Sequence, residues 1–349
     1  MTVEHRGDRP ADGEPTPVAV IGVGHMGRHH ARLYAELPQA RLVAVVDANA
    51  QRAAEHAAKY GCRALASVDE LPEAVRAVTV AVPTSYHVPV TETLLRRGVA
   101  VLVEKRLAAT VEECERLLAC SRETGSLLSV GHTERFNPVV RAIERLNIRP
   151  QYIESQRVSP FRFRSADIGV VADMMIHDID IILHLVRSPV VRVDAIGVTV
   201  LARHEDVANA RVAFESGAVA SLVASRLALK TDRRLRVFSE TAYLSVDYQR
   251  KSGIAITRDA NLDILALAKD KKIEDLSQMA DLDFGKLVKI EPLVVDDAEP
   301  LKVELEAFLH SVRTGAPPAV TGEDGAAAVR LAMQISRSIQ ASAWPRLKA

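Results

Sequence analysis

The chain has 349 residues, which exceeds the length at which one hydrophobic core usually stops growing, so we expect two domains. Its 45 basic and 45 acidic residues cancel, which argues against nucleic acid or an acidic membrane as a partner. Three cysteines, Cys62, Cys114 and Cys120, show neither zinc-ligand spacing nor a disulfide framework. We therefore predict a cytoplasmic protein without a metal.

The first sixteen residues are polar, contain several glycines and prolines, and lack the apolar core of a signal peptide. We predict a disordered tail over residues 1–16. No apolar run in the chain approaches the roughly 20 residues of a membrane span. The sequence therefore predicts a protein that does not enter a membrane.

A glycine-rich segment between an apolar strand and a helix is the clearest local motif. Residues 18–21 are typical of a buried parallel strand, and residues 28–37 are expected to be helical. In the Gly-x-Gly-x-x-Gly between them, the first glycine permits a tight turn and the second leaves backbone open to a pyrophosphate. The third permits close packing of helix on strand. The loop residues predicted to bind a dinucleotide are Gly22, Gly24, His25, Met26 and Gly27.

An acidic residue ends the next predicted strand, at residues 42–46. Asp47 follows Gly27 by about 20 residues, the usual spacing for the acid of a dinucleotide site. Its carboxylate can accept hydrogen bonds from both ribose hydroxyls of an adenosine and repels a 2′-phosphate. The order of strand, glycines, helix, strand and acid predicts a site for NAD.

Helices and strands continue to alternate up to residue 133, which predicts a doubly wound parallel sheet. We place an NAD-binding domain at residues 17–133. Its further elements are expected as helices at residues 50–60, 69–74, 88–97 and 111–124, and as strands at residues 78–82, 99–103 and 127–130.

Polar residues follow two of these strands, at the edge where open α/β sheets bind ligands. Pro83, Thr84 and His87 suit contact with the nicotinamide half of the cofactor, although His87 is equally suited to begin a helix. Glu104 and Lys105 follow the next strand and are likewise candidates for contact with the cofactor. A lysine there can hydrogen-bond a reacting alcohol or ketone oxygen and stabilise alkoxide character.

From residue 134 the pattern changes to runs separated by hairpin-like turns, as at residues 215–217. This predicts a second α/β domain, residues 134–349, with an open and largely antiparallel sheet for substrate binding and oligomerisation. We expect its C-terminal helix to be able to pack back on the first domain. Residues 251–297 have a weak period and predict strand and loop at the rim. Strands are expected at residues 152–158, 190–201, 209–214, 218–225, 234–238 and 242–248, and helices at 138–146, 301–314 and 323–343.

An apolar segment with few charges, residues 173–186, predicts a buried helix. On a regular helix Asp173, His177, Asp180 and His184 would form one narrow stripe. Buried ionisable groups are costly unless paired or used, so the stripe predicts either a proton-handling site or a satisfied core network. His184 fits a structural role. A metal is disfavoured, because no further histidine or cysteine stands at ligand spacing.

Basic residues gather in two segments of the second domain. Arginine forks and lysines that converge on one face suit a phosphorylated or nucleotide-linked substrate, while a solvated charged face is equally compatible with this pattern. The candidate substrate-binding residues are Arg157, Arg162, Arg164, Arg226, Lys230 and Arg233.

The order of these motifs resembles the Gfo/Idh/MocA oxidoreductase family over residues 18–340. Glu104-Lys105-Arg106 stands where that family has Glu-Lys-Pro, and Asp173 and His177 match its Asp-x-x-x-His helix. The resemblance implies that Lys105, Asp173 and His177 are catalytic in hydride transfer. His177 would serve as general acid/base, and the other two would orient the alcohol. It also implies a homo-oligomer, a dimer or a tetramer.

Four segments are most similar to family members that oxidise the 3-hydroxyl of UDP-N-acetylglucosamine with NAD, a step toward lipid A precursors. They are residues 131–138, 173–183, 207–211 and 299–301. The resemblance implies a nucleotide sugar as the substrate. An inositol or other free-sugar dehydrogenase would carry the same lysine, aspartate and histidine. A non-redox or cofactor-sensing member of the fold is a further alternative.

Overall fold

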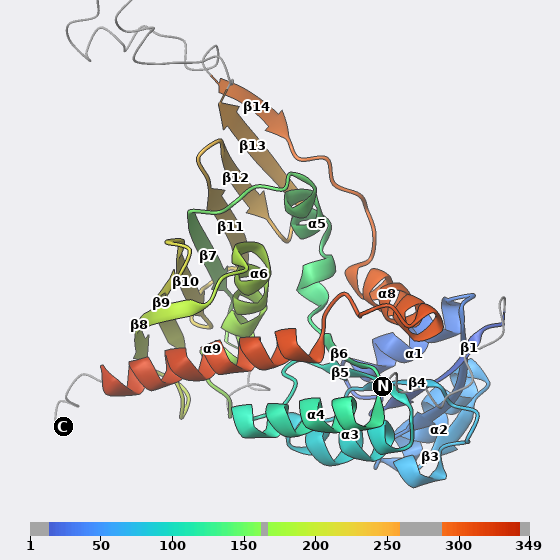
Figure 1. Ribbon diagram of the computed structural model, residues 1–349. Coiled ribbons are helices and arrows are strands. Elements are labelled where there is room, and N and C mark those ends of the chain that lie inside the picture. Colours follow the sequence, from blue (N-terminus) through green and yellow to red (C-terminus); the bar gives the residue numbers. More distant parts are fainter. Residues whose placement is uncertain (1–13, 162–166, 259–287, 343–349) are drawn as a thin grey trace, which may run out of the picture. The chain divides into compact units, whose positions relative to one another are not determined.

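The computed structural model describes residues 14–161, 167–258 and 288–342 (Figure 1). The chain divides into two compact units. The first comprises Met1–Phe136, Val171–His184 and Ala298–Arg337, and the second comprises Asn137–Val170, Leu185–Asp297 and Ser338–Ala349. The segment with Asp173 and His177 therefore belongs to the same unit as the glycine motif.

The first unit is built on a six-stranded parallel sheet with the order β3-β2-β1-β4-β5-β6. This order confirms the doubly wound sheet. Only β3 had no counterpart among the predicted strands, because it has three residues of which two are exposed. The strands are β1 (Thr16–Ile21), β2 (Ala40–Val46), β3 (Arg63–Leu65), β4 (Ala77–Val80), β5 (Ala100–Glu104) and β6 (Leu128–Gly131).

Helices cover this sheet, with α3 and α4 side by side and α8 beside α1 (Figure 1). They are α1 (Gly27–Glu36), α2 (Ala50–Tyr60), α3 (His87–Arg96), α4 (Val111–Thr124), α8 (Pro300–Thr314) and α9 (Gly322–Ala341), whose last turn belongs to the second unit. The helix predicted at residues 69–74 is wrong. A 3₁₀ turn, Val68–Glu70, stands there because Leu71 precedes Pro72 and is held in extended backbone.

The core of the first unit joins sequence-distant helices. Leu301, Leu305 and Phe308 lie at helical spacing on α8 and are buried in one cluster with Leu33 and Tyr34 of α1. Because α8 is contributed from the far end of the chain, this hydrophobic core is completed only after the second unit has been traversed.

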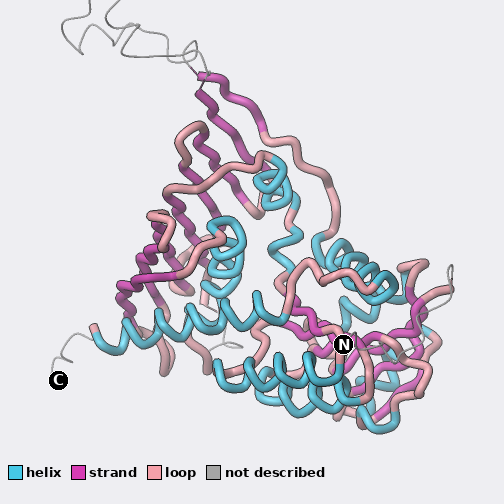
Figure 2. Tube along the Cα trace, viewed as in Figure 1, coloured by secondary structure: helices cyan, strands magenta, loops and turns pink. Residues whose placement is uncertain are grey.

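The second unit contains an eight-stranded sheet with the order β14-β13-β12-β11-β7-β10-β9-β8, drawn in magenta in Figure 2. Only the β7–β10 pair is parallel. This confirms the open, largely antiparallel sheet. Its strands are β7 (Tyr152–Val158), β8 (Val190–Val198), β9 (Val207–Phe214), β10 (Val219–Ser225), β11 (Asp232–Phe238), β12 (Ala242–Asp247), β13 (Ser252–Arg258) and β14 (Val288–Pro292).

The strands explain two differences from the sequence expectations. The strand expected at residues 190–201 ends at Val198, since Asp206 accepts hydrogen bonds from the amides of Val200 and Leu201 and closes a loop. Strands β13 and β14 occupy the two ends of the weakly patterned segment, and residues 259–287 lie outside the described part of the chain.

The helix predicted near residue 138 is α5 (Pro138–Arg145). None of the described helices is long and apolar enough to cross a membrane.

Candidate active site

The glycine loop has the backbone geometry that its three glycines predict. Gly22 has φ +84°, in the left-handed region, and its amide donates to Val46 O at 2.7 Å. A Cβ on Gly27 would stand 1.7 Å from Gly22 O, so only glycine permits α1 to pack this closely on the loop. A Cβ on Gly24 would meet only the Arg52 guanidinium, at 3.9 Å. The middle glycine therefore presents open backbone.

The amino end of α1 is free of competing groups from its own sequence. No side chain caps it, and its first turn contains no acidic residue. The positive end of the helix dipole is thus available to an anion such as a pyrophosphate. The loop residues His25 and Met26 lie immediately before this end, His25 exposed and Met26 half-buried.

Asp47 ends β2 with its carboxylate already oriented. Oδ2 accepts the Val23 amide at 3.0 Å, and Oδ1 accepts the Asn49 amide at 2.9 Å. The Arg52 guanidinium lies 3.4 Å from Oδ2. A carboxylate held by two amides keeps a fixed direction beside the open glycine, which is the arrangement that a ribose diol requires. These residues fit the NAD of a Rossmann domain.

Lys105 directly follows β5, and its ammonium group contacts Asp173. Nζ donates to Asp173 O at 2.7 Å and to Oδ1 at 3.2 Å. Asp173 lies in a π-helical turn, Val171–Met175, just before α6 (Ile176–Val186). Such turns recur at functional sites. Because the two side chains keep 24% and 28% of their surface exposed, a substrate atom can still reach them.

The π-helical turn changes the stripe that a regular helix predicts. Asp173 faces Lys105, whereas Asp180 and His184 contact Arg135. A wide turn takes more residues than an α-helical turn, so Asp173 falls out of line with the groups that follow. His177 is half-buried at the start of α6. Its role as the acid/base stays a prediction.

Glu104, at the last position of β5, is buried behind the lysine. Its Oε1 lies 2.7 Å from His30 Nε2, and its Oε2 accepts the Lys105 amide at 3.2 Å. Burial raises the pKa of Glu104, but the hydrogen bond from His30 and the positive charges of His30 and Lys105 outweigh it, so the pKa lies below its usual range. Glu104 is therefore a carboxylate that fixes the backbone of Lys105.

His87 begins α3, after the neighbouring strand β4, and contacts the backbone of the same loop. Its Nε2 lies 3.0 Å from Val82 O and its Nδ1 lies 2.9 Å from Arg106 O, so the imidazole joins the turn after β4 to the turn after β5. Burial lowers the pKa of His87, although these carbonyl contacts act in the opposite direction. Arg106 stands where a proline was expected, and the peptide bond before it is cis. Pro83 is exposed and Thr84 is half-buried.

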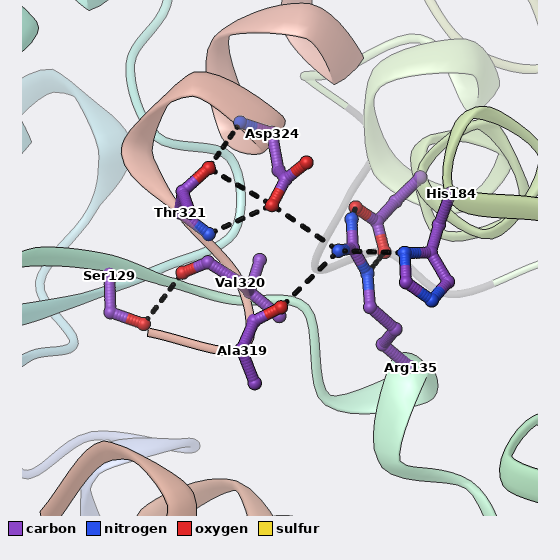
Figure 3. A network of polar contacts seen from close by, with 8 residues as sticks. Ser129, Arg135, His184, Ala319, Val320, Thr321 and Asp324 are labelled. Atoms are coloured by element: carbon purple, nitrogen blue, oxygen red, sulfur yellow. Dashed lines mark hydrogen bonds and ion pairs between the residues drawn. The ribbon is translucent and has the colours of Figure 1, made fainter. Parts of the chain in front are cut away.

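A buried arginine to which no sequence pattern pointed, Arg135, fixes α6. Arg135 donates through Nε and Nη2 to both carboxylate oxygens of Asp180, with Nε 3.0 Å from Oδ2. Its Nη1 reaches Asp324 Oδ2 and His184 Nδ1, each at 3.3 Å (Figure 3). Asp324 also accepts the Thr321 amide and hydroxyl. The network ties α6 and α9 to the turn after β6, so Asp180 and His184 serve the core, as the structural alternative predicts.

Among the candidate substrate residues, Arg157 and Arg233 are direct neighbours on adjacent strands. Arg157 on β7 pairs with Arg233 on β11. The Arg157 guanidinium is buried and lies 5.5 Å from the centre of the Tyr248 ring, while Arg233 is half-buried. Lys230, in the preceding loop, is exposed. Two arginines thus stand side by side on one face of this sheet.

Arg226 is used within the fold of the second unit. Its Nε donates to Asp206 Oδ1 at 2.6 Å, and its Nη1 donates to Ile168 O at 2.7 Å. Burial raises the pKa of Asp206, but backbone amides and Arg226 bring it down to about 2. This ion pair is structural. Arg162 and Arg164 lie outside the described residues.

The described residues contain no cluster of three or more histidine, cysteine or acidic side chains placed to hold a metal ion. Besides Arg135, sequence reasoning missed His30, His132 and Glu304, all of them buried in the first unit. A signal for Glu304 was present, because it interrupts the apolar stripe of its helix. Nothing in the order of residues points from His30 to Glu104, since 74 positions separate them.

Comparison with known proteins places these features in a family. Residues 16–132 match the oxidoreductase family with an NAD-binding Rossmann fold, and residues 145–245 match the Gfo/Idh/MocA C-terminal domain. UDP-N-acetylglucosamine 3-dehydrogenase from Acidithiobacillus ferrooxidans is 34% identical over 323 residues, covering 92% of this chain and 96% of the relative. Its solved structure superposes with a TM-score of 0.83 at 33% identity, covering 94% of this chain and 98% of that one. Inositol 2-dehydrogenase from Rhizobium meliloti is 26% identical over 338 residues, covering 92% and 96% of the two chains.

Two glycine variants should separate folding from cofactor binding. Gly24→Ala is expected to keep the thermal unfolding temperature nearly unchanged, because its methyl group meets open space, yet to weaken NADH binding by at least about tenfold by obstructing the pyrophosphate. Gly27→Ala should instead destabilise the first unit, because its methyl group collides with the Gly22 backbone. Thermal melts and NADH fluorescence titrations measure both. Normal NADH affinity in Gly24→Ala would contradict the role given to the open backbone.

Breaking the Arg135–Asp180 pair should cost far more than breaking a surface pair. Arg135→Met is expected to lower the free energy of unfolding by about 3–5 kcal/mol, because it leaves a buried carboxylate uncompensated. The double variant Arg135→Met/Asp180→Leu should regain much of that loss. Arg192→Met, which removes a pair with both side chains more than half exposed, is the control and should cost less than about 1 kcal/mol. Equal losses in Arg135→Met and the control would rule out a structural role for the pair.

Proposed function

The chain belongs to the Gfo/Idh/MocA oxidoreductase family, and we propose that it oxidises the 3-hydroxyl of UDP-N-acetylglucosamine to the 3-keto sugar. The observation that supports this proposal most strongly is the Lys105–Asp173 contact, in the same unit as the NAD-binding glycine loop. When bound, NAD supplies the hydride acceptor. A sensor that binds the cofactor without catalysis would make no use of a lysine placed at this strand end.

In the proposed reaction, Lys105 donates a hydrogen bond to the sugar hydroxyl and stabilises the negative charge that develops on its oxygen. Asp173 orients the ammonium group through its backbone oxygen and its carboxylate. His177 takes the hydroxyl proton, and bound NAD would accept the hydride from the carbon that carries this hydroxyl. A ketone, NADH and one proton result. Glu104 and His87 hold the loop of Lys105 and take no part in bond making.

The choice of a nucleotide sugar is supported by the paired arginines on β7 and β11. A diphosphate has about two negative charges and needs cationic partners, for which arginine forks are well suited. We propose that Arg233 and Lys230 contact the diphosphate, with buried Arg157 beside Arg233 on the same face of the sheet. Inositol has no such group. The similarity to an inositol dehydrogenase makes a free cyclitol or sugar the competing substrate.

The catalytic roles lead to a prediction for two alanine variants. Lys105→Ala and His177→Ala should each lower kcat by about 100-fold or more, because each loses charge stabilisation or proton transfer. NADH affinity should change little in both. Lys302→Ala and His310→Ala replace an exposed lysine and an exposed histidine of α8 and serve as matched controls. If Lys105→Ala or His177→Ala keeps near-normal turnover, the role given to that residue is wrong.

The substrate assignment leads to a prediction for Arg233. Arg233→Gln should raise the KM for UDP-N-acetylglucosamine by an amount that corresponds to roughly 1.5–3 kcal/mol, with kcat little changed, because the diphosphate is remote from the reacting bond. Arg234→Gln is the matched control. The Arg234 side chain, next along β11, points to the opposite face of the sheet from Arg233 and is 51% exposed. Wild-type protein should oxidise neither N-acetylglucosamine nor myo-inositol efficiently. Efficient turnover of either, unaffected by Arg233→Gln, would assign a free sugar instead.

A further inference from the structure

The buried face of α8 contains one acid among apolar side chains. Leu301, Leu305 and Phe308 pack into the core of the first unit, and Glu304 lies on the same face with 2% of its surface exposed. Its Oε2 accepts a hydrogen bond from the Thr133 hydroxyl at 2.8 Å. Its Oε1 has no hydrogen-bond partner among the described residues. A carboxylate in such a place would be strongly disfavoured, because no cation or amide compensates its charge.

Glu304 and Glu104 are both neighbours of one short segment, residues 131–133. Gly131 on β6 is the strand neighbour of Glu104, and a Cβ there would stand 3.4 Å from Glu104 Oε2. Thr133, two residues further on, donates to Glu304. Both acids are thus held at the turn after β6, and Glu104 in turn accepts the amide of Lys105. Of the two acids, only Glu104 has a histidine nitrogen within hydrogen-bond distance among the described residues.

We propose that Glu304 is an undissociated carboxylic acid that positions the Thr133 turn and keeps a second negative charge away from the Lys105 ammonium group. As a neutral acid it can fill a polar position in an apolar layer without adding to the charge of Glu104. Lys105 then keeps the positive potential that its contact with a reacting oxygen requires. The second half of this inference rests on the proposed role of Lys105.

Burial and the nearest negative charges favour the neutral form of Glu304. Burial raises the pKa of Glu304 well above its usual range, and the negative charges of Glu104 on β5 and Asp180 on α6 raise it further. The hydrogen bond from Thr133 acts in the opposite direction but is outweighed. The Tyr34 hydroxyl of α1 is paired with Thr79 and is neutral. On the turn after β6, the Arg135 guanidinium is held by Asp180 and Asp324, and burial lowers the pKa of the preceding His132. None of these groups forms an ion pair with Glu304.

A stability measurement tests the protonation state without any substrate. The folded protein keeps the Glu304 proton at pH values where the unfolded chain has released it, so folding becomes less favourable as pH rises from the ordinary pKa of 4.5 toward the raised value. Glu304→Gln removes this loss. Its unfolding temperature relative to wild type should therefore increase by at least about 2 °C between about pH 5 and pH 8.

The matched control for this measurement is Glu306→Gln, which changes the same group two residues along on α8, where it is only half-buried. It should show no comparable gain with pH. The carbonyl stretch of an undissociated acid, present in the infrared spectrum of wild type near neutral pH and absent in Glu304→Gln, gives a second readout. A flat or falling difference for Glu304→Gln would overturn the neutral acid, whether or not the proposed reaction is correct.

Activity tests the positioning role. Glu304→Gln should keep kcat within about 3-fold of wild type, because the amide is neutral and still accepts from Thr133. Glu304→Leu should fold, since leucine fits the apolar face, but should lose at least about 10-fold in kcat with NADH affinity retained, because the Thr133 turn loses its acceptor. If Glu304→Gln loses as much as Lys105→Ala, an ionised carboxylate is needed there and the inference is wrong. Full activity in Glu304→Leu would equally overturn the positioning role.

Discussion

The contact between the Lys105 ammonium group and Asp173 is the interaction on which the site depends. It joins the end of a parallel strand to a π-helical turn 68 residues later in the chain. An ammonium group with two hydrogen bonds to one residue has a defined direction, and its remaining donor capacity is available to a substrate oxygen. The rest of the first unit mainly keeps the end of β5 and this turn in place relative to each other.

Two buried polar pairs hold these elements in place, and each has a separate task. The Glu104–His30 pair fixes the backbone of the lysine from behind, and the Arg135–Asp180 pair fixes α6. Removing one partner from such a pair leaves a buried charge, so each pair locks its elements more strongly than an exposed pair would. The Lys105–Asp173 pair differs from these two by its exposure, which would permit exchange of partners in the proposed reaction.

Much of the fold followed from local patterns. The glycine motif, the alternating elements and Asp47 were predictable because each depends on neighbours within about 30 residues. The 3₁₀ turn before Pro72 and the short β3 were missed, since both are decided by details of a few residues. Strong periodicity likewise identified the helix after Asp173, but not the wide turn that precedes it.

The polar interior of the site was less accessible to sequence reasoning. Arg135 meets Asp180 and Asp324 only because three distant elements converge, and no spacing rule connects them. Arg226, by contrast, looked like a substrate ligand because it belongs to a basic segment, whereas its contacts lie within the fold. The sequence shows where charged residues are dense. Burial decides whether such a residue is exposed to a ligand or is paired with another residue in the core.

The most direct test of the central claim follows the reacting hydrogen. UDP-N-acetylglucosamine labelled with deuterium at carbon 3 is incubated with the protein and NAD, and the NADH formed is examined by mass spectrometry. The account predicts NADH that contains the deuterium, formed more slowly than from the unlabelled sugar. NADH without the label, or no NADH from this substrate while an unphosphorylated sugar yields it readily, would contradict the assignment of this chain as a dehydrogenase of a nucleotide sugar.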